Sequence, residues 1–500
     1  MSSQARPQRP NLLILNGTVV DGTGRPGFRA DVSVAGDRIV EVGTVRAEGA
    51  RTIDASGCVV APGFIDVHTH DDLALVREPA IDFKVMQGVT TDIVGNCGVG
   101  AAPASESYLE FYRTVLGSIL GPMDVPEWTT TEEYYRAVEE AGPSLNVASF
   151  VPHNTLRFLA MGMERRPPTA SELGAMKELL AAGMAAGALG LSSGLIYPPG
   201  IFAATEELID LARVVAEYEG MYASHIRNEG DGLLEAVEEA IRIGEEGGVR
   251  VEISHLKAAG RSNWGRVEES LRRIEEARAR GVDVNADGYP YTAGSTSLGI
   301  IVLMRGTEQW EPEEVLVGSV RHQHRYEGMN LAQIAQEMGL PPVEAAQRLL
   351  EEEENAVVAV VFMMSEEDVQ RVMSHEMTMF GSDGIPTPGG KPHPRLYGTF
   401  PRVLGRYVRE MGLLSLEEAV RKMTSLPARK HRLAERGELR PGWFADLVVF
   451  DAATVADSAT YQEPRQHPLG IHHVIVNGRV VVDEGKHTGA SAGRVLRGGR

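Results

Sequence analysis

The chain has 500 residues, of which 43% are hydrophobic and 24% are charged, so it has enough apolar material for a large core. Its formal net charge of −20 argues against nucleic-acid binding, because a polyanion needs a cationic surface. It has two cysteines, no apolar run of the ~18 residues that span a membrane, and no apolar signal-peptide segment near its start. We therefore expect a cytoplasmic protein without nucleic-acid or membrane partners.

Residues 8–62 are predicted to form short β-strands separated by tight turns. Apolar residues alternate with polar ones, and glycines mark the corners, in NLLILNGTVV, DVSVAG, RIVEVG and CVVAPG. The same pattern returns within residues 431–490, in ADLVVFD and HHVIVNGRVVVDEG. Two β-rich ends that flank one long middle predict a small β-sandwich domain formed jointly by both segments.

The middle of the chain, residues 63–430, alternates between apolar runs and amphipathic helical stretches such as SELGAMKELLAAGMAAG. Eight apolar runs occur, and each ends in polar residues: FIDVHTH, TTDIVGNC, NVASFVPH, LGLSSGLIY, MYASHIR, VRVEISHLK, VDVNADGYPY and MTMFGSDG. Such an alternation predicts a parallel sheet, and eight strands predict an α/β fold of the (β/α)8 or TIM-barrel type. The polar ends lie at the C-terminal side of the strands, where barrel enzymes carry their chemistry.

The spacing of these polar ends supports the count of strands. His68 and Cys97 are 29 positions apart, and His225 and His255 are 30 apart. Asp287 and Asp383 are separated by 96 positions, which is about three such units. We therefore predict an insertion near residues 296–357, between the seventh and eighth strands, and interpret it as a candidate lid.

Several strand ends carry residues that bind metals. His68 and His70 lie two apart on a predicted strand, so both rings are expected to face inward, and neutral imidazole suits Zn²⁺. Further ligand types end four other strands: Cys97, His225, His255 and Asp383. Six candidate ligands are too many for one tetrahedral zinc and suit a site for two metals or a partly filled one. Cys97 alone is equally typical of a small buried apolar residue.

The motifs that carry these residues resemble those of a known family. HTH after PGFID, the late GSD, and TSLPARKHRL with RGELRPGWFADLVVFD are similar to the amidohydrolase superfamily. Within it, GVTTDIVGNCG, GLSSGLIYPPG, SHIRNEGD, EISHLKAAG, DGYPYTAGST and HPRLYGTFPR resemble the N-acyl-D-amino-acid deacylases, also called D-aminoacylases. The similarity runs over nearly the whole chain. The fourth predicted strand, LGLSSGLIY, has no lysine for a carboxylated metal bridge, which favours this cysteine-containing branch over hydantoinase-like enzymes.

The resemblance implies a metal assignment. Cys97, His225 and His255 would hold one tightly bound zinc, and His68 and His70 would form a second, weaker position with Cys97 as a bridge. Asp383 would be the catalytic carboxylate, which takes a proton from the attacking water and then gives it to the departing amine. A turn or helix-capping role is the alternative for an aspartate in an SDG sequence.

The resemblance also implies that Lys257, Tyr289, Ser295 and Arg395 bind the carboxylate of an anionic N-acyl amino acid. Tyr291 follows the same strand as Tyr289, and Arg227, His153 and Tyr197 are weaker candidates. The predicted activity is hydrolysis of an N-acyl-D-amino acid to a carboxylate and a D-amino acid. A cyclic-amide hydrolase or dipeptidase with the same metal chemistry, and a non-catalytic binding protein on the same barrel, are the alternatives.

Overall fold

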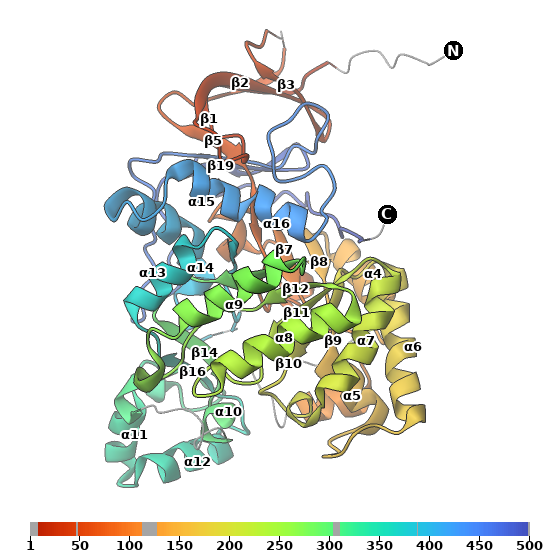
Figure 1. Cartoon of the computed structure of the whole chain (residues 1–500). Helices are drawn as coiled ribbons and strands as arrows, with labels where there is room; N and C mark the ends of the chain where they lie inside the picture. Colours follow the sequence, from red (N-terminus) through yellow and green to blue (C-terminus); the bar gives the residue numbers. More distant parts are fainter. Residues whose placement is uncertain (1–8, 47–48, 113–127, 304–310, 388, 499–500) are drawn as a thin grey trace.

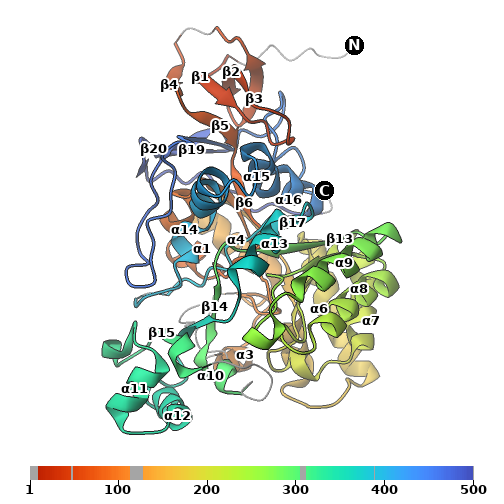
Figure 2. The same cartoon turned by 60° about the vertical axis from the view of Figure 1, so that its left-hand side comes forward.

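The computed structural model describes residues 9–46, 49–112, 128–303, 311–387 and 389–498. The molecule has three regions along its length. Figures 1 and 2 both place the N-terminal strands at one end of the molecule, the barrel in the middle, and helices α11 (Leu331–Met338) and α12 (Pro342–Glu352) at the other end. None of the described helices is long and apolar enough to cross a membrane.

The middle of the molecule is an eight-stranded parallel barrel, as the apolar runs predicted. Its strands are β6 (Phe64–Asp66), β7 (Val89–Val94), β8 (Asn146–Ser149) continued by β9 (Val151–Pro152), β10 (Gly190–Gly194), β11 (Met221–His225), β12 (Arg250–Ile253), β13 (Val284–Gly288) and β17 (Thr378–Phe380). The last strand returns to the first through a parallel bridge between Thr69 and Gly384, and His70 N donates to Gly384 O at 2.9 Å. The barrel is therefore closed next to the predicted His68–His70 pair and Asp383.

Helices surround the barrel because each presents an apolar face to the strands. They are α1 (Ala74–Arg77), α2 (Asp82–Val85), α3 (Glu106–Phe111), α4 (Thr131–Ala141), α5 (His153–Met161), α6 (Ala170–Ala186), α7 (Thr205–Glu217), α8 (Leu233–Gly247), α9 (Val267–Ala279), α13 (Glu366–Ser374), α14 (Arg395–Arg402), a π-helix (Val403–Glu410), α15 (Leu416–Met423) and α16 (Ser425–Lys430). Several begin with the capping signals of their sequence; in α6, the Thr169 hydroxyl and the Glu172 carboxylate form a reciprocal capping box.

The two ends of the chain share one β-sheet, as their common pattern predicted. Strands β1 (Leu12–Val19), β2 (Phe28–Ala35), β3 (Arg38–Gly43), β4 (Arg51–Asp54) and β5 (Val59–Pro62) join β18 (Leu447–Phe450), β19 (Ile471–Val476), β20 (Arg479–Asp483) and β21 (Lys486–His487). The junction is the antiparallel pair of β5 and β18, in which Val59 faces Phe450. Buried side chains from both segments, such as Ile14 and Leu447, pack in one core.

Between β13 and β17 the chain forms a separate small unit. Its antiparallel sheet contains β14 (Ala293–Ser297), β15 (Val315–Ser319) and β16 (Val358–Phe362), and its helices are α10 (Leu298–Leu303), α11 and α12. Leu298, Val317, Ile334 and Leu349 belong to its own apolar core. This unit covers the predicted insertion, and the lid role remains a prediction.

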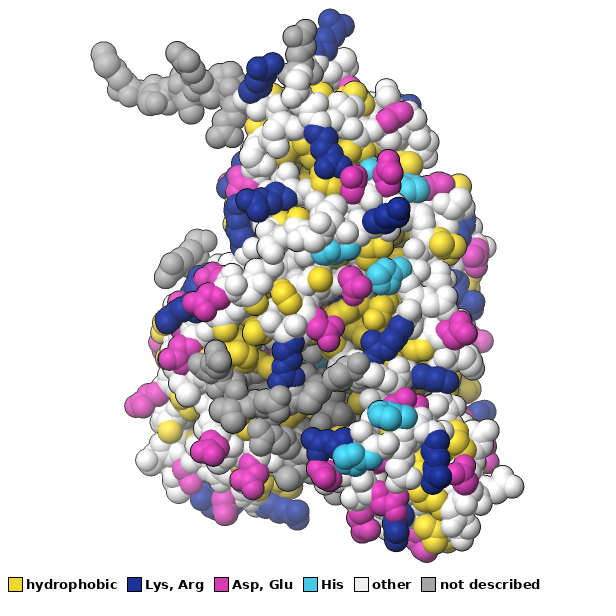
Figure 3. Space-filling model, turned by 180° about the vertical axis from the view of Figure 1, so that it is seen from behind, with side chains coloured by type: hydrophobic (Ala, Val, Ile, Leu, Met, Phe, Trp, Pro, Cys, Tyr) yellow, Lys and Arg dark blue, Asp and Glu magenta, His cyan; other side chains and the backbone are white. Residues whose placement is uncertain are grey.

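The opposite, amino-terminal end of the barrel is closed by α16. Leu426, Ala428 and Leu433 pack against interior side chains of the barrel strands, including Ile65 and Met221. Figure 3 shows acidic and basic side chains intermixed over the face seen from behind. Because α16 covers the amino-terminal end, the carboxyl ends of the strands remain as the place for a site, which is where TIM-type barrels carry their active sites.

Candidate metal and active site

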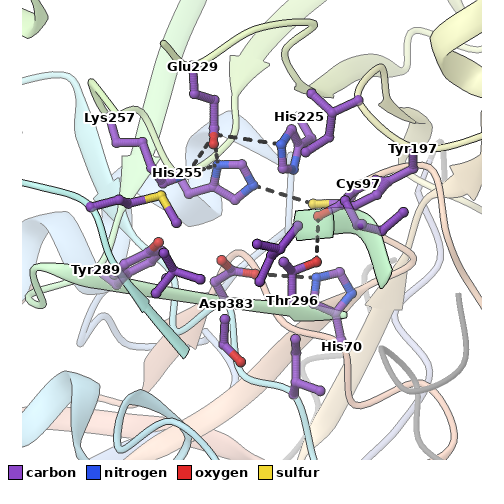
Figure 4. Close-up of a pocket in the computed structure, with 18 residues that line it drawn as sticks. His70, Cys97, Tyr197, His225, Glu229, His255, Lys257, Tyr289, Thr296 and Asp383 are labelled. Carbon is purple, nitrogen blue, oxygen red and sulfur yellow. Dashed lines mark hydrogen bonds and ion pairs between the residues drawn. The ribbon is translucent and has the colours of Figure 1, made fainter. Parts of the chain in front are cut away.

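The six predicted ligands meet at the carboxyl end of the barrel. His68 Nε2 lies 3.2 Å from Cys97 Sγ, and Cys97 Sγ lies 3.5 Å from His255 Nε2. Asp383 Oδ1 lies 3.3 Å from His70 Nε2 and 3.6 Å from His68 Nε2. The ring centres of His225 and His255 are 4.3 Å apart. Figure 4 shows Cys97, His225 and His255 on one side of the pocket and His70 and Asp383 on the other.

These distances fit the geometry of bound metal. Ligand atoms about 2.0–2.3 Å from a tetrahedral Zn²⁺ lie about 3.3–3.8 Å from one another. Among the described residues, three groups bring their potential ligand atoms within 4.8 Å of one another: His68, Cys97 and His255; His68, His70 and Asp383; and His225, Glu229 and His255. Both ring nitrogens of His225 are buried and have no hydrogen-bond partner among the described residues. The donor set therefore suits zinc, and His68 and His255 each belong to two of the groups.

The electrostatics of Cys97 and His225 agree with a ligand role. Burial raises the pKa of the Cys97 thiol, but the nearby His68 and His255 rings outweigh burial and hold this pKa well below its usual value. The thiolate is the form that binds metals. Burial lowers the pKa of His225, which favours the neutral ring that a metal requires.

Three of the predicted ligands stand on an unusual backbone. Cys97, His255 and Asp383 each follow a barrel strand and have φ values of 53°, 36° and 50°. This left-handed region is costly for residues other than glycine, and such residues cluster at functional sites. Gly194 is also required here, because a Cβ on it would lie 2.0 Å from Cys97 O.

Asp383 is held as an anion at the centre of this arrangement. Arg395 Nη1 lies 2.8 Å from Asp383 Oδ2, while Oδ1 faces the His68 and His70 rings. Burial raises the pKa of Asp383, but Arg395 and His70 outweigh burial and hold the pKa well below its usual range. Arg395 itself is fully buried behind Asp383 and donates to Ser295 O at 3.2 Å.

Two carboxylates that the sequence did not single out support the predicted ligands. Glu229 Oε1 lies 3.0 Å from His255 Nδ1 and 2.6 Å from Lys257 Nζ. Asp287 accepts from the His255 backbone N–H at 2.8 Å and lies 3.3 Å from His68 Nδ1. Glu229 follows His225 by four positions in SHIRNEG, and Asp287 ends the seventh strand, so their positions were the available signals.

The ligands open onto a pocket. Lys257, Tyr289 and Ser295 line it, as does Tyr197, whose hydroxyl lies 3.4 Å from Thr296 Oγ1. The Ser295 hydroxyl is buried and has no hydrogen-bond partner among the described residues. The apolar part of the lining consists of Ile196, Ile300, Ile301, Val361, Met363 and Ile385.

Three weaker candidates lie away from this pocket. The Tyr291 ring packs edge-on against His393 and lies under the Arg402 guanidinium. Arg227 pairs with Glu239 at 2.8 Å, and His153 Nε2 lies 2.8 Å from Glu207 Oε1. Arg227 and His153 thus have structural ion-pair partners instead of a place in the site.

The family model described as "Amidohydrolase family" matches residues 51–482. The match includes all eight barrel strands and every predicted ligand. The chain belongs to the amidohydrolase family.

Relatives that match the chain over nearly its whole length show to which branch of the family it belongs. The chain is 43% identical to a D-aminoacylase of Alcaligenes xylosoxydans xylosoxydans, over 99% of each chain. It is 44% identical to an N-acyl-D-glutamate deacylase of the same organism, over 98% of this chain and 97% of the relative. A crystal structure of N-acyl-D-glutamate deacylase from Bordetella bronchiseptica, complexed with zinc and a phosphonate mimic of the tetrahedral intermediate, superimposes with a TM-score of 0.90 at 43% identity, covering 98% of this chain and 100% of that one. Within the family, the chain belongs with the N-acyl-D-amino-acid deacylases, as its motifs predicted.

Proposed function

We propose that this protein is a zinc-dependent hydrolase that converts an N-acyl-D-amino acid into a carboxylate and a free D-amino acid. The observation that carries this proposal is the convergence of six ligand-type side chains on one pocket, in a chain that matches deacylases over its whole length. The unpaired cysteines Cys58 and Cys97 fit a reducing compartment, and we propose the cytoplasm.

Two metal positions are part of this proposal, as the resemblance to the deacylases implies. Cys97, His225 and His255 would hold one zinc tightly, and the contacts of His255 with Cys97 and with the His225 ring support this set. His68, His70 and Asp383 would form the second, weaker position, with Cys97, which contacts His68, shared between the two. When bound there, zinc supplies Lewis-acid chemistry, since it lowers the pKa of coordinated water toward about 7 and polarises a carbonyl group.

Asp383 would move the proton that the reaction requires. As an anion it accepts a proton from water while the water oxygen bonds to the amide carbon. The same carboxyl group then donates this proton to the amide nitrogen as the C–N bond breaks. The products are the carboxylate and the D-amino acid, whose amino group takes up the proton that the newly formed acid releases. Giving up its proton returns Asp383 to the carboxylate form, which Arg395 stabilises as an ion pair.

An anionic substrate would be bound by groups on one wall of the pocket. Lys257 carries a charge at the wall, and its ammonium group lies 5.9 Å from the centre of the Tyr289 ring. The free Ser295 hydroxyl and Tyr289 supply hydrogen-bond donors. The Arg395 guanidinium lies 4.6 Å from the centre of the same Tyr289 ring, which places a second positive charge next to this wall. We propose that these four residues bind the substrate carboxylate.

The test is a substrate screen with parallel measurement of zinc content. N-acetyl-D-amino acids with apolar, Glu-like and Asp-like side chains are compared with their L-enantiomers, with hydantoins and with dipeptides. We expect turnover of at least one D-substrate, loss of turnover after zinc removal by a chelator, and recovery on adding zinc. Turnover confined to a cyclic amide or a dipeptide would replace this proposal, and a folded protein that binds no zinc would end it.

A further inference from the structure

We propose that His431, at the amino-terminal end of the barrel, is a positioning residue for the metal site at the other end. It would act through Glu252 and Asp287, two carboxyl groups inside the barrel. This inference rests on the proposed function only in that the ligands His68 and His255 are taken to bind zinc.

The chain of contacts begins at the ligands. Asp287, on β13, uses one oxygen to accept from the His255 backbone N–H at 2.8 Å, and its other oxygen lies 3.3 Å from His68 Nδ1. Asp287 thereby fixes the backbone of one predicted ligand and the ring of another. Partners of this kind orient metal-binding histidines and select their tautomer.

The next contact lies deeper in the barrel. Glu252, on β12, is 2% exposed and pairs in register with Asn285 of β13, two positions before Asp287, so Glu252 and Asp287 are neighbours on the same face of adjacent strands. Barrel interiors are usually filled by bulky apolar side chains, so a buried carboxyl group at this depth is exceptional. Burial raises the pKa of Glu252, which agrees with a carboxylic acid that donates to Asp287.

His431 ends the chain of contacts from the opposite side. It follows α16, the helix that closes the amino-terminal end, and its Nε2 lies 2.9 Å from Glu252 Oε2. Its Nδ1 lies 3.0 Å from Pro427 O, and its ring packs edge-on against Phe150. The ring is therefore fixed by partners on both nitrogens and by an aromatic neighbour.

The consequence is a continuous set of contacts along the barrel axis. His431 borders a hollow at the amino ends of the strands, together with Gly220 and Arg250. The predicted metal ligands lie at the carboxyl ends. Helix α16 thus contributes to the metal site without touching it, because Asp287 keeps its orientation only while Glu252 is held by His431.

The experiment compares two buried histidine–glutamate pairs. His431→Phe keeps a ring but removes both nitrogens, and we expect zinc affinity, measured by chelator competition without substrate, to fall about 10- to 100-fold. His153→Phe is the matched control: His153 and Glu207 have the same side-chain exposures, 0% and 2%, as His431 and Glu252, and their separation is 2.8 Å. This control is expected to lose stability but to keep the wild-type zinc affinity.

A second pair of variants keeps the test decisive if His431→Phe does not fold. Glu252→Gln retains a donor toward Asp287 and is expected to bind zinc within about threefold of wild type, whereas Glu252→Met should show the full loss. Equal zinc affinities in Glu252→Met and wild type, or equal losses in His431→Phe and His153→Phe, would overturn the inference. Wild-type zinc binding and turnover are measured separately, so a wrong substrate assignment leaves this comparison intact.

Discussion

Two buried lysines of the barrel have similar charges but different roles. Lys84, on α2, is fully buried, and its ammonium group contacts Asp66 Oδ2 at 2.5 Å, Ser382 Oγ at 2.5 Å and Thr69 Oγ1 at 2.9 Å. Lys257 is 6% exposed, contacts Glu229 at 2.6 Å, and lines the pocket. In both, burial lowers the pKa, but the neighbouring carboxylates outweigh burial and raise it, so both lysines remain charged.

The difference lies in what surrounds each ion pair. The oxygens around Lys84 come from the strand ends that carry His68 and Asp383, and Asp66 Oδ1 also accepts from the Ser382 backbone N–H at 2.8 Å. Lys84 therefore ties the first and last strands together and is fully enclosed by protein groups. Lys257 faces the pocket that the free Ser295 hydroxyl also lines. A buried charge points to binding when it opens onto a cavity, and to stability when protein groups surround it.

Asp383→Asn should have the largest effect on activity, because it removes the proposed proton carrier from the pocket that Lys257 also lines. We expect kcat to fall by about 10²- to 10⁴-fold, the usual contribution of a general acid–base. Zinc content should stay near one ion per chain, since the residues proposed to hold the tight zinc, Cys97, His225 and His255, are unchanged. Turnover and bound metal are measured on the same preparation. A loss of zinc in proportion to activity would show that Asp383 acts mainly as a ligand.

Lys84→Met tests the lysine that protein groups surround. Removing one partner of a buried ion pair leaves Asp66 uncompensated, so we expect the free energy of unfolding to fall by about 3–5 kcal/mol. Denaturant unfolding measures the loss. The double variant Lys84→Met/Asp66→Asn should recover part of it, because it removes the unpaired charge. An unchanged midpoint in the single variant would contradict the assignment of Lys84 to stability.

The sequence was sufficient to predict the strands and the convergence of the candidate ligand residues, for a physical reason. The barrel strands are buried on both faces, so most of them lie in apolar runs whose polar ends mark the carboxyl side. His68, Cys97 and Asp383 stand at such ends, so the count of strands also placed the ligands at one rim. The left-handed backbone of Cys97 and Asp383 was not visible in the sequence, because neither residue type demands it.

Contacts between distant segments were beyond such reasoning. Glu229 looks like one more acid in a chain with 69 acidic residues, and only the folded barrel brings it to Lys257. The ion pair of Arg395 with Asp383 was also not predicted, because it depends on α14 beginning directly behind the Asp383 loop. His431 reaches Glu252 across 179 positions, and no periodicity records this contact.

Lys257→Met should have a smaller effect than either variant above. A hydrogen bond to a charged group contributes about 1.5–3 kcal/mol, so we expect kcat/KM for an N-acetyl-D-amino acid to fall about 10- to 100-fold, mainly through KM. The matched amide, in which the substrate carboxylate is a carboxamide, should show little difference between variant and wild type. An equal loss on both substrates would mean that Lys257 acts on zinc binding through His255, which lies 2.7 Å away.

A third buried lysine sharpens the comparison further. Lys422, on α15, donates to His375 O at 2.7 Å and to Met373 O, but no described carboxylate lies in ion-pair contact with it. Burial therefore lowers its pKa to about 7.

The unfolded chain, in which Lys422 has the ordinary pKa of 10.5, binds more protons than the folded chain above pH 7, so the free energy of unfolding must rise with pH in that range. We expect a gain of about 1 kcal/mol between pH 7 and pH 8 from this residue, and Lys422→Met should remove that part of the slope in denaturant unfolding. Lys84→Met should leave the pH dependence of the free energy of unfolding unchanged, because a lysine paired with carboxylates is charged in the folded and the unfolded state over this range. An identical pH dependence in Lys422→Met and wild type would show that backbone carbonyls alone keep a buried lysine charged.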